Sequence, residues 1–91
     1  MVALSMGADG LLLASAIDAV VARPPRVRAL NPTGAGDALM AGLALALERG
    51  LPLDQIARWG VAAGTASAMH SQVGFDSIRE VEALLPQVTV T

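Results

Sequence analysis

The 91 residues carry a formal net charge of −2, from six Arg and no Lys against eight acidic side chains, and 54 % of them are hydrophobic. A chain of this length forms one small domain, and the absence of Cys excludes disulfides, a thiolate nucleophile and a Cys-based zinc site. The absence of Lys excludes the lysine-containing phosphate loop and the protein-kinase scheme, and the weakly acidic balance argues against a nucleic-acid partner.

The first third of the chain predicts short strands. Residues 2–5 and 11–14 are apolar runs of strand length, separated by a turn that contains two glycines. Because these runs are continuously apolar rather than alternating, they predict a sheet that is covered on both faces. Residues 15–22 and 26–29 are also predicted to be extended, with a Pro-Pro pair breaking the chain between them.

The remaining two thirds predict helices. The first is expected over residues 37–49, the second from residue 54 to about 71, and the third over 78–85, followed by a terminal strand over 87–91. The continuously apolar strands and these helices together predict a sheet flanked by helices, in a single domain. No run of eighteen apolar residues and no signal-peptide pattern occurs, so we expect a soluble cytoplasmic protein without a membrane partner.

Several side chains have predicted local roles. Ser77 and Glu80 have the spacing of a capping box at the start of the third helix. Gly42 is expected to allow close packing of the first helix, since glycine otherwise destabilises a helix interior. Arg58 is placed on the outer side of the second helix, and His70 is expected to cap the end of that helix or to face solvent.

The segment from residue 30 to residue 42 is the most informative of the chain, because a glycine-rich loop runs directly into a helix. Pro32 prevents a regular strand or helix just before the glycines. Gly34 and Gly36 let several backbone N–H groups point the same way, at a helix N-terminus that also favours negative charge. This segment therefore predicts an anion-binding cradle.

Asp37 stands in the first turn after this cradle and has two interpretations. It either complements the helix dipole, or it is a general base that takes a proton from a hydroxyl while the neighbouring N–H groups hold negative charge. Its position in the sequence is compatible with both roles.

Three other segments also have two interpretations. Residues 5–10 form either an ordinary hairpin turn or a turn whose amides approach a ligand. The small residues from 62 to 68 permit close approach by another helix or by a flat ligand. The Arg cluster at positions 23, 26 and 28 either forms an exposed loop, the interpretation we favour, or binds phosphate.

The stretch Asn-Pro-Thr-Gly-Ala-Gly-Asp-Ala at residues 31–38 is similar to the second signature of the PfkB, or ribokinase-like, carbohydrate kinases. Its opening Asn-Pro resembles most the branch of 1-phosphofructokinases and tagatose-6-phosphate kinases. The resemblance implies that Asp37 is the catalytic base and that Gly34, Ala35 and Gly36 form the anion hole for the transferred phosphoryl group.

The resemblance also assigns nucleotide contacts. The turn from Ser5 resembles the Ser/Thr-x-Gly-x-x-Gly turn that precedes the signature in PfkB kinases and contacts the nucleotide, and the helix after Asp54 resembles the one that helps to form the adenine pocket. The implied ATP-binding residues are Ser5, Gly7, Ala8, Asp9 and Gly10 in the turn, with Ala63, Gly64 and Ser67 in the helix.

The resemblance implies the C-terminal portion of a three-layer α/β/α fold, covering only the last third of a family member. The implied reaction is phosphoryl transfer from ATP to a sugar hydroxyl, for example on fructose 1-phosphate or tagatose 6-phosphate, with Mg²⁺ carried by ATP rather than by a protein metal site. Asn31 replaces an Asp of many relatives, which argues against potassium dependence. The alternative is a fragment without independent activity that binds nucleotide or forms oligomers, with a second copy or the remainder of a larger kinase as its partner.

Overall fold

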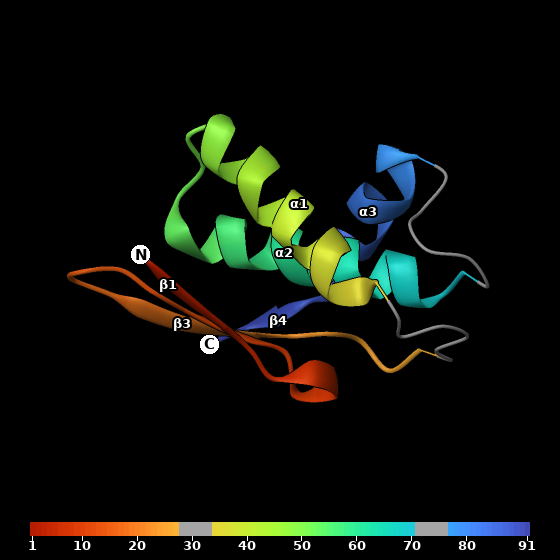
Figure 1. Cartoon of the computed structure of the whole chain (residues 1–91), viewed down its shortest axis with the longest axis horizontal. Helices are drawn as coiled ribbons and strands as arrows, with labels where there is room; N and C mark the ends of the chain where they lie inside the picture. The colour runs from red at the N-terminus through yellow and green to blue at the C-terminus, as the bar shows by residue number, and fades with distance from the viewer. Residues whose placement is uncertain (28–33, 71–76) are drawn as a thin grey trace.

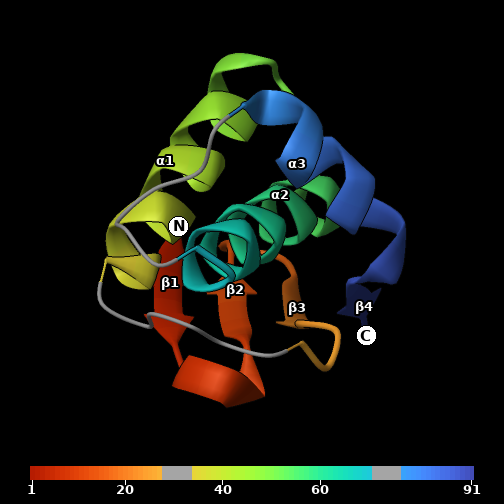
Figure 2. The ribbon, with the colours of Figure 1, turned by 90° about the vertical axis from the view of Figure 1, so that its right-hand side faces the viewer.

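The computed structural model describes residues 1–27, 34–70 and 77–91 (Figure 1). They form an antiparallel sheet and a layer of helices on one of its faces (Figures 1 and 2). No helix in these ranges is long and apolar enough to span a membrane. In chain order the elements are β1 (Val2–Ser5), the 3-10 helix η1 (Gly7–Asp9), β2 (Leu11–Ala14), β3 (Ala19–Arg23), α1 (Ala35–Glu48), α2 (Leu53–Ala68), α3 (Ile78–Leu84), the 3-10 helix η2 (Leu85–Gln87) and β4 (Thr89–Val90).

The four strands follow one another across the sheet in the order β1-β2-β3-β4, and every neighbouring pair is antiparallel. Val2 lies opposite Ala14, Leu11 lies opposite Ala22, and Ala22 also lies opposite Val90. The bounds of β1 and β2 agree with the prediction, because each is a compact apolar run ended by turn residues. β1 and β4 form the two edges of this sheet.

The third strand differs from the prediction. Residues 15–18 form a tight turn, in which the Ser15 N–H donates to the Asp18 carbonyl oxygen at 2.7 Å and the Asp18 N–H donates to Ser15 Oγ at 3.2 Å. The strand therefore begins only at Ala19. Residues 24–27 have no regular structure, and residues 28 and 29 of the second predicted extended piece lie outside the described residues.

The helices cover one face of the sheet. Leu11 and Leu13 point towards α2 and are 0 % and 1 % exposed, whereas Val2 and Leu4 point to the opposite face and are 68 % and 54 % exposed. Side chains alternate along a strand, so the two sets lie on opposite faces. The strands are apolar on both faces as predicted, but within the described residues only one face is covered.

The two long helices, α1 and α2, pack closely through glycines. A Cβ atom at Gly42 would lie 2.6 Å from the carbonyl oxygen of Trp59 and 2.8 Å from Cβ of Ala63. A Cβ atom at Gly60 would lie 2.6 Å from Cδ2 of Leu43. Such distances are far inside van der Waals contact, so the predicted role of Gly42 in helix packing is confirmed. Most of α2 is buried, since it lies between the sheet and the other helices (Figure 2).

Arg58 does not lie on the outer side of α2 as predicted. Its side chain is half-buried, and its Nη1 donates to the carbonyl oxygen of Leu85 at 3.0 Å and to that of Val88. The prediction was wrong because helical periodicity does not reveal that η2 returns to this side of α2. Arg58 thereby attaches η2 and the approach to β4 to the central helix.

The predicted capping box is also wrong. The Ser77 side chain makes no capping hydrogen bond, and Oε2 of Glu80 instead lies 2.8 Å from Nε2 of His70. Both side chains are about one third exposed, at 31 % for His70 and 32 % for Glu80. His70 is therefore a side-chain partner of α3 rather than a solvent-facing residue, and this pair connects the end of α2 to α3.

Candidate functional site

A cavity of about 520 Å³ lies where the N-terminus of α1, the second half of α2 and the turn after β1 approach one another. This volume falls in the range of small-molecule sites, which is about 300–1,000 Å³. The lining residues come from four separate segments of the chain: Ser5, Gly7, Gly10, Pro24, Pro25, Arg26, Val27, Ala35, Gly36, Leu39, Val61, Gly64, Thr65 and Ala68. Most of these residues are apolar or lack a side chain.

The N-terminus of α1 forms the polar end of this cavity. Gly34 has φ +85° and precedes the helix, and its carbonyl oxygen accepts the N–H of Ala38 at 3.0 Å. The N–H groups of Ala35, Gly36 and Asp37 come before this first bond, so they have no acceptor within the helix. The helix begins two residues earlier than predicted, which brings Gly36 into its first turn.

Gly36 leaves open space at the cavity wall. A Cβ atom at this position would meet no atom within 4 Å apart from its chain neighbours and the backbone of its own helix, and both Ala35 and Gly36 line the cavity. The adjacent Asp37 is exposed and does not belong to the lining residues. The helix therefore presents backbone N–H groups to the cavity and a carboxylate beside it. Leu30, Asn31, Pro32 and Thr33 of the predicted cradle lie outside the described residues.

The turn between β1 and β2 forms a second wall. The Met6 N–H donates to the Gly10 carbonyl oxygen at 2.7 Å, and the Gly10 N–H donates to the Gly7 carbonyl oxygen at 3.1 Å. Gly10 has φ +105°, and a Cβ atom there would lie 2.0 Å from the Ala22 carbonyl oxygen. Gly10 is thus required by the fold, while also lining the cavity together with Ser5 and Gly7.

One predicted contact in this turn does not line the cavity. Asp9 belongs to η1, is exposed and is absent from the lining residues. The predicted contact at Ala8 stays a prediction. The turn therefore combines both interpretations offered by its sequence, because it closes a hairpin and also places part of its backbone against the cavity.

The wall formed by α2 differs from the predicted set. Gly64 lines the cavity, but Ala63 and Ser67 are 1 % and 0 % exposed and do not. The lining residues of α2 are Val61, Gly64, Thr65 and Ala68, which share one helix face by their three- and four-residue spacing. Counted from Val61, that spacing gives Gly64, Thr65 and Ala68, so it is the signal that could have identified Thr65. The Oγ1 of Thr65 donates to the Val61 carbonyl oxygen at 2.8 Å.

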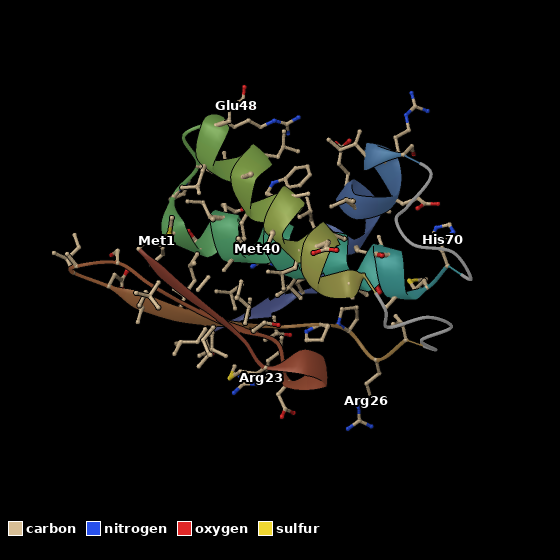
Figure 3. The ribbon with its side chains drawn as sticks, viewed as in Figure 1. Met1, Arg23, Arg26, Met40, Glu48 and His70 are labelled. Atoms are coloured by element: carbon tan, nitrogen blue, oxygen red, sulfur yellow. The ribbon has the colours of Figure 1, made fainter. Side chains whose placement is uncertain are left out.

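Sequence reasoning also missed the segment after β3. Pro24, Pro25, Arg26 and Val27 line the cavity, although this stretch was expected to be an exposed loop. The side chain of Arg26 is exposed and points away from the helices (Figure 3), as does that of Arg23. The two prolines and Val27 therefore supply an apolar wall to the cavity, and the rigid ring of each proline limits its backbone to few conformations.

The family model for pfkB family carbohydrate kinases matches residues 1–80 of this chain. The chain belongs to this family. The PfkB chain is 37 % identical over 90 residues to the 1-phosphofructokinase of Bacillus subtilis, an alignment that covers 99 % of this chain and 29 % of the relative. The alignment with this relative therefore includes nearly all residues of the chain, although the chain spans less than a third of the relative's length.

Solved structures support the ribokinase-like fold of the PfkB chain. Phosphofructokinase-2 from Escherichia coli, in complex with substrates and products, superposes with a TM-score of 0.86 and 26 % identity, covering 93 % of this chain and 27 % of that one. Ribokinase from Thermotoga maritima superposes with a TM-score of 0.80 and 26 % identity, covering 92 % and 29 %. The predicted α/β class and the predicted family are both confirmed.

The cavity of this chain suits a ligand with a flat apolar part and an anionic part. The faces of α2 and of residues 24–27 are mainly apolar, whereas the start of α1 offers free N–H groups at the positive end of a helix dipole. Across the described ranges no three metal-ligating side chains come together.

Proposed function

We propose that these residues form the ATP-binding and catalytic-base part of a sugar-phosphate kinase. The observation that carries the proposal is the meeting of three elements at one cavity: the α1 N-terminus, the turn from Ser5 to Gly10 and the small-residue face of α2. Family membership supports a kinase that acts on a carbohydrate. ATP supplies the transferable phosphoryl group and carries Mg²⁺ on its phosphate oxygens.

In this proposal different walls of the cavity contact different parts of ATP. Val61, Gly64 and Ala68 offer apolar surface that suits a flat nucleobase. Ser5 and Gly7 offer a hydroxyl and backbone amides to the polar part of the nucleotide. In this proposal the buried Ala63 and Ser67 support the wall from behind rather than touching ATP, and Asp9 belongs to the turn itself.

In this proposal the groups that take part in phosphoryl transfer lie at the N-terminus of α1. The free N–H groups of Ala35 and Gly36 stabilise negative charge on the phosphoryl oxygens, and Gly34 positions them by its left-handed conformation. The Asp37 carboxylate accepts the proton of the attacking sugar hydroxyl. In a loose phosphoryl transfer this proton leaves late, so the position of the carboxylate matters more than its basicity.

The acceptor in this proposal is a primary hydroxyl of a sugar phosphate, such as fructose 1-phosphate or tagatose 6-phosphate. The resemblance of the signature to that branch and the similarity to the 1-phosphofructokinase of Bacillus subtilis support this choice. The second candidate is a nucleotide-binding fragment without independent activity. It is favoured by the share of the relative that this chain covers, 29 %, and by the exposure of Asp37.

Nucleotide binding by the 91-residue chain tests the site directly. Gly36→Leu puts a side chain into the open space at the cavity wall, where a Cβ atom meets nothing within 4 Å, so folding is preserved while the cavity is filled. We expect ATP binding, measured by calorimetry, to weaken at least tenfold, and thermal unfolding to change little. Ala83→Leu, at an exposed position of α3, is the matched control.

Equal ATP affinity in Gly36→Leu and in the unchanged chain would refute the nucleotide site. A phosphorylation assay with the same samples distinguishes the two candidates. ATP binding without sugar phosphorylation supports the fragment, and turnover by the isolated chain supports a kinase that is complete in itself.

A further inference from the structure

The two apolar walls of the cavity are connected by contacts that lie outside it. The second wall is the segment over residues 24–27, which follows directly on β3, so its position depends on how the end of β3 is held. The first wall is the face of α2 that carries Val61, Gly64, Thr65 and Ala68.

The end of β3 is held from two sides. Ala22 is 0 % exposed, and a Cβ atom at Gly10 would lie 2.0 Å from its carbonyl oxygen. On its other side Ala22 lies opposite Val90 of β4. The next residue, Arg23, lies opposite Thr89. The strand end that leads into the second wall therefore lies between the hairpin turn and β4.

Hydrogen bonds join β4 to this part of β3. The Val21 N–H donates to the Thr91 carbonyl oxygen at 2.9 Å, and the Thr91 N–H donates to the Val21 carbonyl oxygen at 2.8 Å. Nη1 of Arg23 also donates to Oγ1 of Thr91 at 3.4 Å. Because these bonds couple the two strands, the position of β4 affects where β3 ends.

Arg58 holds the approach to β4 from α2. Its Nη1 donates to the carbonyl oxygen of Leu85 at 3.0 Å and to that of Val88, which is 3 % exposed and leads into β4. Arg58 precedes Val61 by three residues, so it lies one turn before the cavity-lining residues on the same side of α2. The helix that forms the first wall therefore also holds β4, which lies beside β3 (Figure 2).

We propose that Arg58 is a positioning residue of the nucleotide site, which sets the separation of the two apolar walls without touching the ligand. This inference rests on the proposed function, since it takes ATP as the ligand of the cavity. Dispersion contacts lose a quarter to a half of their energy when a gap of about 0.5–1 Å opens. A small outward movement of residues 24–27 is therefore enough to weaken the binding of a flat base.

Loss of the Arg58 bonds leaves the other packing of α2 in place. The helix also packs directly against β2 and β3, and Leu11, Leu13 and Ala22 belong to the buried core. Arg58 itself is only half-buried. A variant without its guanidinium is therefore expected to fold and to bind ATP more weakly.

Calorimetric titration with ATP, at a temperature where each variant is folded, tests the inference. Arg58→Met leaves the Leu85 and Val88 carbonyl groups without this donor. If the second wall then occupies its binding position about one tenth of the time, ATP affinity falls about tenfold, because apparent affinity scales with the fraction of competent molecules. Arg58→Lys keeps a charged donor and should recover part of the affinity. Unchanged ATP affinity in Arg58→Met would overturn the inference.

Two controls separate positioning from a general loss of stability. Ile56→Val removes a buried methyl group from α2 but no bond to η2 or Val88. Arg79→Met removes an exposed guanidinium from α3. Both should bind ATP as the unchanged chain does, because lower stability does not weaken binding by molecules that remain folded. An equal loss of affinity in Ile56→Val and Arg58→Met would contradict the positioning role.

Amide hydrogen exchange distinguishes a failure of this inference from a failure of the proposed function. The Val21 N–H donates to Thr91, so its exchange reports the pairing of β3 with β4 without any nucleotide. We expect exchange about tenfold faster in Arg58→Met than in Ile56→Val, because local opening then costs less. Equal exchange would overturn the role of Arg58. The expected exchange, together with no ATP binding by the unchanged chain, would support that role and refute the ATP site.

Discussion

Asp37 is distinguished from an ordinary helix-terminal acid by what surrounds it. Ala35 and Gly36, directly before it, line the cavity with N–H groups that have no acceptor in the helix. Asp54 is likewise an exposed acid in the first turn of its helix, α2, but it does not line the cavity. The two carboxylates therefore share a helix-dipole environment and differ in what they can reach.

This comparison gives a matched test of the proposed base. When this chain replaces the matching segment of the Bacillus subtilis 1-phosphofructokinase, Asp37→Asn is expected to lower kcat by about 10²–10⁴-fold, the usual contribution of a general base. Nucleotide affinity should change little, because the amide keeps the size of the carboxylate. Asp54→Asn is the control and should keep normal turnover. Steady-state kinetics of the two variants measure this difference. Near-normal turnover in Asp37→Asn would contradict the proposal that Asp37 is the catalytic base.

Arg58 shows how one side chain can join distant parts of the chain. Its guanidinium reaches the carbonyl oxygens of Leu85 and Val88, which lie 27 and 30 residues further along. These carbonyl groups belong to η2 and to the residue that leads into β4. The edge strand β4 is therefore held partly through α2.

Arg58→Met should destabilise the fold, because it keeps most of the aliphatic volume but leaves two carbonyl groups without their donor. We expect a loss of about 1.5–3 kcal/mol in the free energy of unfolding, the range for hydrogen bonds to a charged group. Urea denaturation measures this loss. Arg79→Met, at an exposed position of α3, should change stability by less than about 0.5 kcal/mol. A similar effect of the two substitutions would contradict the structural role of Arg58.

At the scale of elements, the contact between α1 and α2 determines where the N-terminus of α1 lies. Gly42 and Gly60 bring the two helix backbones close together. Near the cavity, a Cβ atom at Gly64 would lie 3.2 Å from the carbonyl oxygen of Ala35. The glycines thus fix the first turn of α1 against the wall that α2 provides.

Two glycines of α1 give opposite predictions for the same substitution. Gly42→Ala should destabilise by about 1–3 kcal/mol, because its Cβ atom would overlap Trp59 and Ala63 by more than the gain in helix propensity offsets. Gly36→Ala meets no neighbour within 4 Å and should stabilise by up to about 1 kcal/mol. Thermal unfolding of both variants checks the signs, and a stabilising Gly42→Ala would show that the helices separate easily.

At the scale of the whole molecule, the described residues form a sheet with one covered face and one exposed apolar face. Val2, Leu4, Leu12 and Val21 all point to the exposed side. The chain covers 29 % of the length of the Bacillus subtilis relative.

The sequence by itself determined the features that depend on near neighbours. The apolar runs and turn glycines defined β1 and β2, the spacing of apolar residues defined three helices to within a few residues, and residues 31–38 identified the family. Each depends on backbone preferences or on a short motif, so a local stretch of chain is sufficient. The extended piece predicted over residues 15–22 was only partly right, because a short polar turn within it was read as strand.

Only the tertiary structure decided which residues meet across the chain. It placed Thr65 rather than Ala63 or Ser67 at the cavity, joined Glu80 to His70 instead of to a capping box, and turned Arg58 towards η2. It also left one face of an apolar sheet uncovered in the described residues. These outcomes depend on contacts between residues far apart in sequence, which the periodicity of a single element cannot specify.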